Sequence, residues 1–90
     1  MVVTGPGISS GSRFDGMVSQ LDYFPTILKL TGGQIGSEYE NELSGLDISA
    51  VLAGQSQTVV DADGTERQSL FWHFPHSSPD HMQTAIREGD

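Results

Sequence analysis

The sequence contains no cysteine in its 90 residues, which excludes disulfide bonds, thiolate zinc ligands and a thiol nucleophile. Basic residues are also scarce, because four Lys and Arg stand against twelve Asp and Glu and give a formal net charge of −8. A field of this sign repels phosphate backbones and anionic lipid, so we expect neither nucleic-acid nor membrane-surface binding. No apolar run approaches the ~18 residues of a membrane span, and the first residues show no signal-peptide pattern. The cellular compartment therefore stays open.

The apolar content indicates a small hydrophobic core. Leu, Ile, Val and Phe make up 22 of the 90 residues, above the ~20% below which chains tend to stay unfolded. Ninety residues give room for one small domain or a piece of a larger one. A chain of this length buries only about 60% of its unfolded surface, and no disulfide compensates for a thin core. Its ability to fold alone is therefore in question.

The clearest helix is expected over residues 22–31. Asp22 is placed as its N-cap, and Pro25 falls at the third helical position, where the missing N–H costs nothing. Gly32 and Gly33 follow as a stop signal. The apolar residues of this helix share one stripe, formed by Phe24, Ile27 and Leu28. Such a stripe needs a partner surface.

The other segments of the first two thirds carry weaker signals. We expect the end of a strand over residues 1–4, a loop over 5–16, a short strand or helix entry over 17–20, an acidic solvated excursion over 34–44, a second short helix from Asp47 to Ala53, and a tight turn at 61–64.

The last third changes character and favours β-structure. Residues 69–74 form a dense strand pattern that is apolar on both faces, as is typical of a covered strand, and Pro75 ends it. Residues 83–87 predict a second strand, which runs into the turn signal Glu88-Gly89-Asp90. A turn of this kind returns a further strand alongside the first. We therefore expect the chain to be a fragment of a longer protein.

Two short motifs have the spacing of known sites but the wrong surroundings. Residues 7–11 match the G-x-S-x-G spacing of a hydrolase nucleophile elbow, yet no helical pattern follows the Ser, so a loop is favoured. Asp61-x-Asp63-Gly64 resembles the start of a calcium loop, but the third acidic ligand and the late Glu are missing. A surface turn is the better interpretation.

The densest set of proton-carrying side chains lies within nine positions and comprises His73, His76, Asp80 and His81. His73 and His76 have an odd spacing in an extended segment, which places them on opposite faces and disfavours a shared metal ion. One interpretation packs His73 in the strand and leaves the other His residues in solvent. The other places His73 or His76 at the rim of a cleft, where imidazole could hydrogen-bond an anionic or sugar substrate. Ser77 and Ser78 beside them indicate a polar loop and no catalytic triad.

Five segments of the chain also carry recognisable motifs. They are residues 4–8 (TGPGI), 21–28 (LDYFPTIL), 45–54 (GLDISAVLAG), 70–76 (LFWHFPH) and 84–90 (TAIREGD). In this order they resemble the sulfatase family of the alkaline phosphatase-like superfamily. The middle segment departs from that family's usual DGxSLxPLLxG, since Ser44 replaces the acid, Asp47 the Ser and Ala50 the Pro. These departures touch a cap and a loop and leave the resemblance standing.

The resemblance implies an α/β fold, of which this chain is a C-terminal-region fragment. Members of the family have a large α/β domain with a mixed sheet, followed by a smaller subdomain with an antiparallel sheet. Residues 1–54 would be the end of the large domain and 55–66 a connecting loop. Residues 67–90 would open the incomplete C-terminal subdomain with its first antiparallel strands.

The resemblance also implies what the chain lacks. The family hydrolyses sulfate esters with a formylglycine, made in a Cys/Ser-x-Pro-x-Arg motif, and a calcium ion held by Asp and Asn side chains. This sequence has no such motif, and the family's metal-binding carboxylates lie upstream of its matching region. We therefore expect no catalytic residue, no metal ligand and no cofactor in this chain, which should be inactive when isolated.

The partners implied by the resemblance are the rest of the parent chain and, through it, a sulfated small molecule or carbohydrate. A periplasmic or secreted parent is implied as well. His73 and His76 are the expected substrate-side residues, as rim contacts only. Two alternatives remain open: a stand-alone acidic binding module, and a fragment of a related phosphate or phosphonate ester hydrolase.

Overall fold

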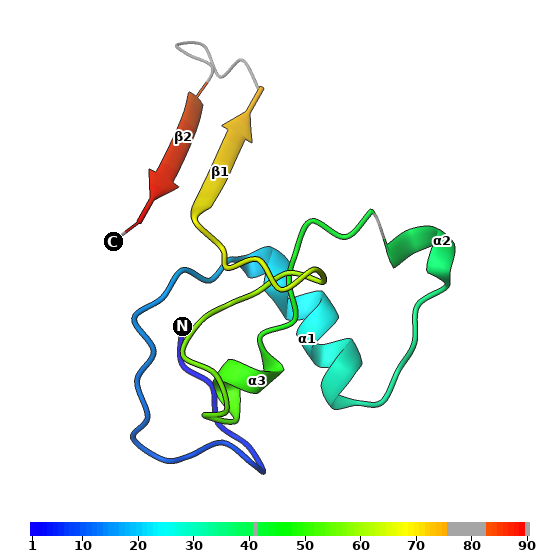
Figure 1. The fold of residues 1–90 in the computed structure, drawn as a ribbon, viewed down its shortest axis with the longest axis vertical. Coiled ribbons are helices and arrows are strands. Elements are labelled where there is room, and N and C mark those ends of the chain that lie inside the picture. The colour runs from blue at the N-terminus through cyan, green and yellow to red at the C-terminus, as the bar shows by residue number, and fades with distance from the viewer. Residues whose placement is uncertain (41, 76–82, 90) are drawn as a thin grey trace.

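A computed structural model describes residues 1–40, 42–75 and 83–89. The helices and strands come in the order η1 (Gln20–Asp22), α1 (Tyr23–Leu30), α2 (Ser37–Glu40), α3 (Ser49–Leu52), β1 (Ser69–Phe74) and β2 (Gln83–Glu88). The helices gather in one part of the molecule, whereas the two strands form a hairpin that projects away from it (Figure 1). Among the described residues, no helix is long and apolar enough to span a membrane.

The long helix begins where the sequence predicts it, but the side-chain cap belongs to the 3-10 turn that precedes it. Ser19 caps the 3-10 turn η1 with a capping box, in which its Oγ accepts from the Leu21 amide at 3.3 Å and Asp22 Oδ2 accepts from the Ser19 amide at 2.7 Å. Asp22 lies at the N-cap position of α1, as predicted, but its side chain makes no capping bond to that helix. Pro25 does lie at the third position of α1. Gly32, at φ 70°, takes up the left-handed conformation that ends it.

The second predicted helix is present as the single turn α3, which packs against α1. Asp47 lies just before it, and its Oδ1 accepts from the Ser49 amide at 2.8 Å. The acidic excursion contains a helical turn that the sequence did not predict, α2, and Tyr39 within it is exposed. The strand end expected over residues 1–4 is absent, because no other described strand offers these residues a backbone partner.

The two predicted strands are present and pair with each other in antiparallel register. Ser69 pairs with Glu88, and Phe74 pairs with Gln83. One face carries Leu70, Trp72 and Phe74 of β1 with Arg87, Ala85 and Gln83 of β2. The opposite face carries Phe71 and His73 with Ile86 and Thr84. This matches the antiparallel strands that the resemblance implies for this region.

The interior of the chain is small and partly polar. Only Ile48 and Val59 are buried hydrophobic residues in the described part, and they are accompanied by Asp22 and Thr26. The total accessible area is 7283 Å², against about 5,100 Å² expected for a compact monomer of this mass. The radius of gyration, 15.1 Å, likewise exceeds the expected value of about 12 Å.

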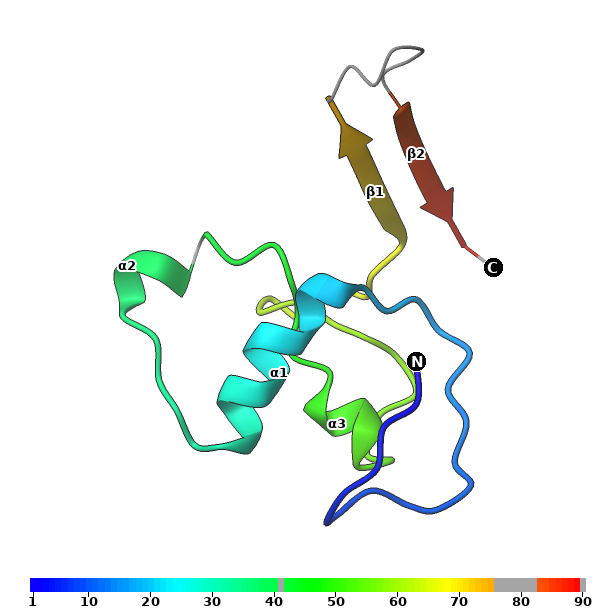
Figure 2. The ribbon, with the colours of Figure 1, turned by 180° about the vertical axis from the view of Figure 1, so that it is seen from behind.

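Apolar surface remains uncovered on both the helix and the hairpin. The predicted stripe of α1 is largely in solvent, with Phe24 54% and Ile27 59% exposed. The expectation that β1 is covered on both faces is wrong for this chain, because Phe71 is 63% exposed and Trp72, on the other face, is 39% exposed. Figure 2 shows the reason, since the hairpin stands clear of the helices from behind as well.

Candidate functional site

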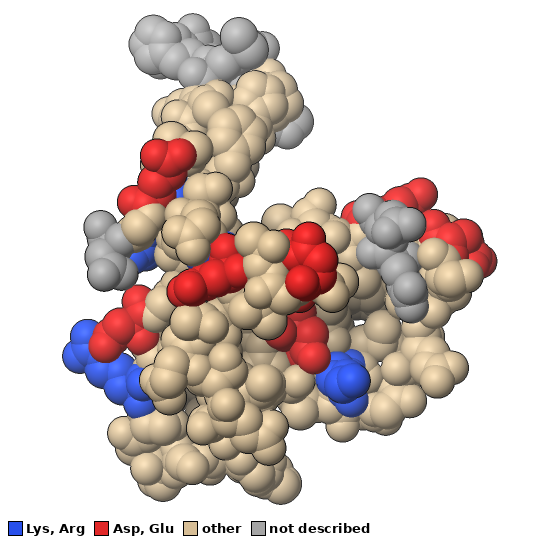
Figure 3. All heavy atoms as spheres, viewed as in Figure 1, with Lys and Arg blue, Asp and Glu red and all other residues tan. Residues whose placement is uncertain are grey.

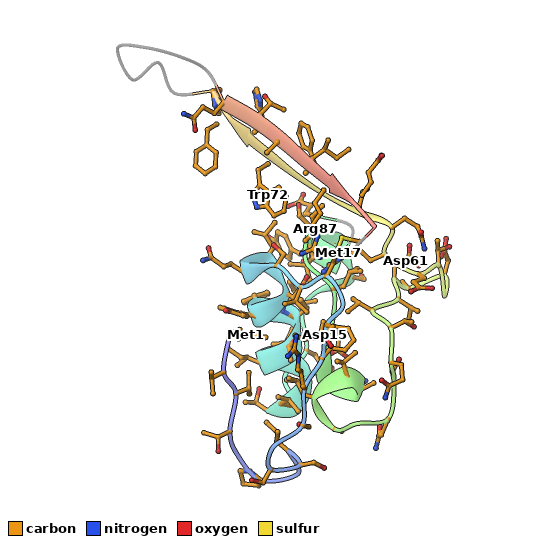
Figure 4. All side chains as sticks on the ribbon, turned by 90° about the vertical axis from the view of Figure 1, so that its left-hand side faces the viewer. Met1, Asp15, Met17, Asp61, Trp72 and Arg87 are labelled. Atoms are coloured by element: carbon orange, nitrogen blue, oxygen red, sulfur yellow. The ribbon has the colours of Figure 1, made fainter. Side chains whose placement is uncertain are left out.

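An open groove of about 1260 Å³ separates the hairpin from the helical part. One wall comes from residues 18–21 with Ser44 and Leu46, and the other from residues 65–74. In the side view of Figure 4, Trp72 and Arg87 extend from the hairpin toward the helical part. The groove therefore combines leucine and aromatic surface with amide, hydroxyl and acidic groups. Acidic atoms outnumber basic ones on the face shown in Figure 3.

His73, one of the two predicted substrate-side residues, borders this groove from β1, but it lies on the face of the hairpin opposite Trp72 and Arg87. Its Nδ1 lies 3.0 Å from Thr84 Oγ1 on the paired strand, and its ring stacks on Phe71 with centroids 6.3 Å apart. The imidazole is exposed, and among the described residues its second nitrogen has no hydrogen-bond partner. This geometry suits a hydrogen-bonding contact that Thr84 keeps in one orientation.

The second predicted residue, His76, lies outside the described residues. The same holds for Ser77, Ser78, Asp80 and His81, so His73 is the member of that cluster that the structure describes. The expectation that His73 and His76 do not share a metal ion therefore stays a prediction.

A buried ion pair lies at the edge of the groove, which Arg67 itself lines. Arg67 donates two hydrogen bonds of 2.7 Å to Asp22, from Nη1 to Oδ2 and from Nη2 to Oδ1. The Asp22 side chain is fully buried and that of Arg67 is 7% exposed. A fork-to-fork pair of this kind fixes both distance and orientation.

Two backbone amides complete the surroundings of Asp22. Its Oδ1 accepts from the Leu46 amide at 2.9 Å, and its Oδ2 accepts from the Ser19 amide. Burial by itself raises the pKa of Asp22, but the hydrogen bonds from Arg67, Leu46 and Ser19 and the positive charge of Arg67 hold that pKa below its ordinary value. The carboxylate is therefore ionised at neutral pH and ties together three separate segments.

Thr26, one turn along α1 from Asp22, extends this polar cluster. Its Oγ1 donates to the Asp22 carbonyl at 2.6 Å and accepts from the Ile48 amide at 3.0 Å. Gly45 allows the segment carrying these amides to approach, because a methyl group at that position would overlap the carbonyl oxygen of Leu21. The cluster thus places residues 45–48 directly on the start of the long helix.

Sequence reasoning missed Arg67 and Thr26. One signal was available for Arg67, which is one of only four basic residues and directly precedes the strand pattern. A buried arginine must meet a carboxylate, but twelve acidic residues were candidates.

The described residues do not fit the calcium ion or the formylglycine that the resemblance implies for a complete enzyme. No group of three His, Asp or Glu side chains converges in the described part. The Asp61–Gly64 turn is present as expected, and its carboxylates are engaged by its own backbone. Asp61 Oδ1 accepts from the amides of Asp63 and Thr65. Ser9 sits in a turn without a following helix, as the sequence predicts. We derive no catalytic step from these residues.

Comparison with known proteins gives one informative relative. Over 58 residues the chain is 34% identical to a protein of Formosa agariphila named "Sulfatase", and the match covers 64% of this chain and 10% of that protein. No family model matches the chain, and no solved structure matches it. The relative supports a relation to the sulfatase family, and the chain corresponds to about a tenth of the length of the protein that it matches.

Proposed function

We propose that this chain works as part of a sulfatase and that the complete protein hydrolyses a sulfate ester of a small molecule or carbohydrate. The observation that carries the proposal is the 58-residue match to a sulfatase, of which it covers 10%. The uncovered faces of α1 and the hairpin support it, because exposed apolar surface of this extent is typical of protein that packs against more protein. The rest of the parent chain is then the partner.

In this proposal the chain supplies structure and a groove wall but no reacting group. Residues 1–54 belong to the end of the large domain, residues 55–66 connect, and residues 67–90 open the C-terminal subdomain. Calcium and formylglycine belong to the missing part, so the isolated chain has no means of cleaving a sulfate ester. His73 and His76 act at the rim as hydrogen-bonding contacts to the substrate.

The test starts with the source DNA on both sides of this reading frame. We expect an in-frame Cys/Ser-x-Pro-x-Arg motif upstream and a further strand downstream. The longest open frame should then be expressed with the formylglycine-generating machinery and assayed with 4-nitrophenyl sulfate, next to the 90-residue chain. Turnover by the long form alone supports the proposal, whereas stop codons on both sides would contradict it and favour the acidic binding module.

Two controls sharpen this assay. A parallel measurement with 4-nitrophenyl phosphate separates a sulfatase from the related phosphate or phosphonate ester hydrolase. In the long form, His73→Gln should raise KM for a carbohydrate sulfate and leave kcat nearly unchanged, because a rim contact binds ground state and transition state alike. The matched variant Tyr39→Phe, at an exposed residue of α2 that does not line the groove, should change neither constant.

A further inference from the structure

In the described part of the chain, Arg67 is the residue that hydrogen-bonds the hairpin side to the helical part. Among the described residues, every hydrogen bond between residues 65–89 and residues 1–58 comes from its guanidinium. Two of these bonds go to Asp22, and a third runs from Nη1 to the Met17 carbonyl at 3.3 Å. Within the described residues, the two strands pair with each other, and the Cα atoms of neither strand come within 8 Å of those of a helix.

The position of Arg67 in the chain makes this contact mechanically important. It lies two residues before β1 begins at Ser69 and just after the tight turn at 61–64. Its amide donates to the Val59 carbonyl at 2.8 Å, and the Gly89 amide donates to the Gln68 carbonyl next to it at 3.2 Å. Both ends of the hairpin therefore meet at the residue whose side chain enters the buried cluster.

We propose that the Asp22–Arg67 pair is a clamp that sets the orientation of the β1–β2 hairpin on the helical part and thereby the shape of the groove between them. Arg67 is a positioning residue in this role. The pair fixes an angle as well as a distance, because a planar guanidinium and a planar carboxylate joined by two bonds must lie nearly in one plane. The inference concerns the geometry of this chain and does not depend on the sulfatase proposal.

The absence of cysteine makes the proposal directly measurable. Cysteines introduced at Lys29, exposed on α1, and Ile86, exposed on β2, would be the only ones in the chain and can each carry a nitroxide label. Pulsed electron paramagnetic resonance on the full 90-residue chain then reports the distance between helix and hairpin. We expect a single narrow distance distribution for the labelled chain, and a distribution at least twice as wide after Arg67→Gln.

The matched control is Arg13→Gln. Arg13 forms an ion pair of similar length with Asp15, but both side chains are largely in solvent, at 84% and 75% exposure. This variant changes the net charge by the same amount and should leave the distance distribution unchanged. An equal width for Arg67→Gln and Arg13→Gln would overturn the proposal, as would a broad distribution in the labelled chain itself.

Arg67→Gln leaves Asp22 as a buried charge without its partner, so this variant could unfold. Dispersed amide signals in an NMR spectrum decide whether it has. If they are lost, Arg67→Lys answers the question, because it keeps the positive charge but replaces the planar fork with a single donor group. The clamp predicts a wider distribution with dispersed signals retained, and a distribution as narrow as that of the unchanged chain would refute it.

Discussion

The hydroxyl of Thr26 gives the sharpest test of the polar interior. Valine has nearly the same shape as threonine, so Thr26→Val removes the hydroxyl without opening a cavity. The residue is 4% exposed, and its Oγ1 is the acceptor for the amide of Ile48, which is itself 2% exposed. Water therefore has poor access to replace the lost acceptor. The substitution leaves a backbone donor unsatisfied in the interior.

The size of the effect follows from the two bonds that disappear. An orphaned buried donor costs about 1–3 kcal/mol, and loss of the bond from Oγ1 to the Asp22 carbonyl adds about 0.5–1.5 kcal/mol. We expect the free energy of unfolding to fall by about 2–3 kcal/mol. Since 1.4 kcal/mol is a factor of ten, a loss of 2 kcal/mol raises the open population about 30-fold.

Two measurements check this prediction. Urea unfolding followed by far-UV circular dichroism gives the overall loss, and hydrogen exchange of the Ile48 amide gives the local one. The control is Thr31→Val, where Oγ1 donates to the carbonyls of Ile27 and Leu28 but is exposed. That variant should stay within about 0.5 kcal/mol of the unchanged chain. Equal losses for the two variants, or unchanged exchange at Ile48, would refute the reasoning.

Three further predictions concern the backbone approach, the buried charge and the hairpin. Gly45→Ala should abolish the folded state in a thermal melt, because its methyl group overlaps the Leu21 carbonyl, whereas Gly5→Ala, with no heavy atom closer than 4.0 Å, should be neutral. The pKa of Asp22 is lower in the folded chain than its value of about 4 in the unfolded chain, so the ionised carboxylate stabilises the fold fully above the unfolded pKa. This stabilisation is lost as pH falls through the folded pKa, and we expect the urea midpoint to be level above about pH 5 and to drop below pH 4. A midpoint that stays level down to about pH 2 would contradict this. Trp72 is the single tryptophan and is 39% exposed, so acrylamide should quench its fluorescence readily in this chain and less in the longer protein; equal quenching in both would show that nothing covers it.

The elements of this fold could be predicted because their signals are local. Pro25 near the start of α1 and Gly32 after its end mark that helix within a few residues. The strand pattern of residues 69–74 and its stop at Pro75 are equally local, and both strands form as expected. The prediction for Asp22 is confirmed in position but not in its hydrogen bond. A carboxylate at an N-cap usually accepts from an amide of the first turn, whereas here Asp22 Oδ2 accepts from the amide of Ser19, which caps the preceding turn.

The buried cluster could not be predicted, because its members are far apart in the sequence. Asp22 and Arg67 are separated by 45 residues, and Leu46 by 24 from the carboxylate that it meets. Periodicity places apolar residues inside, but this chain buries the polar face of α1. Asp22 and Thr26 share that face because they are four residues apart. The same reason applies to the candidate site. The prediction for His73 rests on residue type alone and stays a prediction, whereas the Asp22–Arg67 pair has no local signal in the sequence.

The polar face of α1 and its exposed apolar stripe therefore have different roles in the fold. Removing paired charges from water gains little free energy, so a buried ion pair is a weak source of stability, and its best attested role is to select one arrangement over others. Stability must then come from apolar burial, yet the accessible area of 7283 Å² leaves about half of the unfolded surface of roughly 14,000 Å² exposed. Ile27, 59% exposed, and Phe71, 63% exposed, are the kind of surface that could supply the missing burial. We infer that the polar cluster specifies how the segments of this chain meet, and that contact with further protein over α1 and the hairpin would add to the free energy that holds them there.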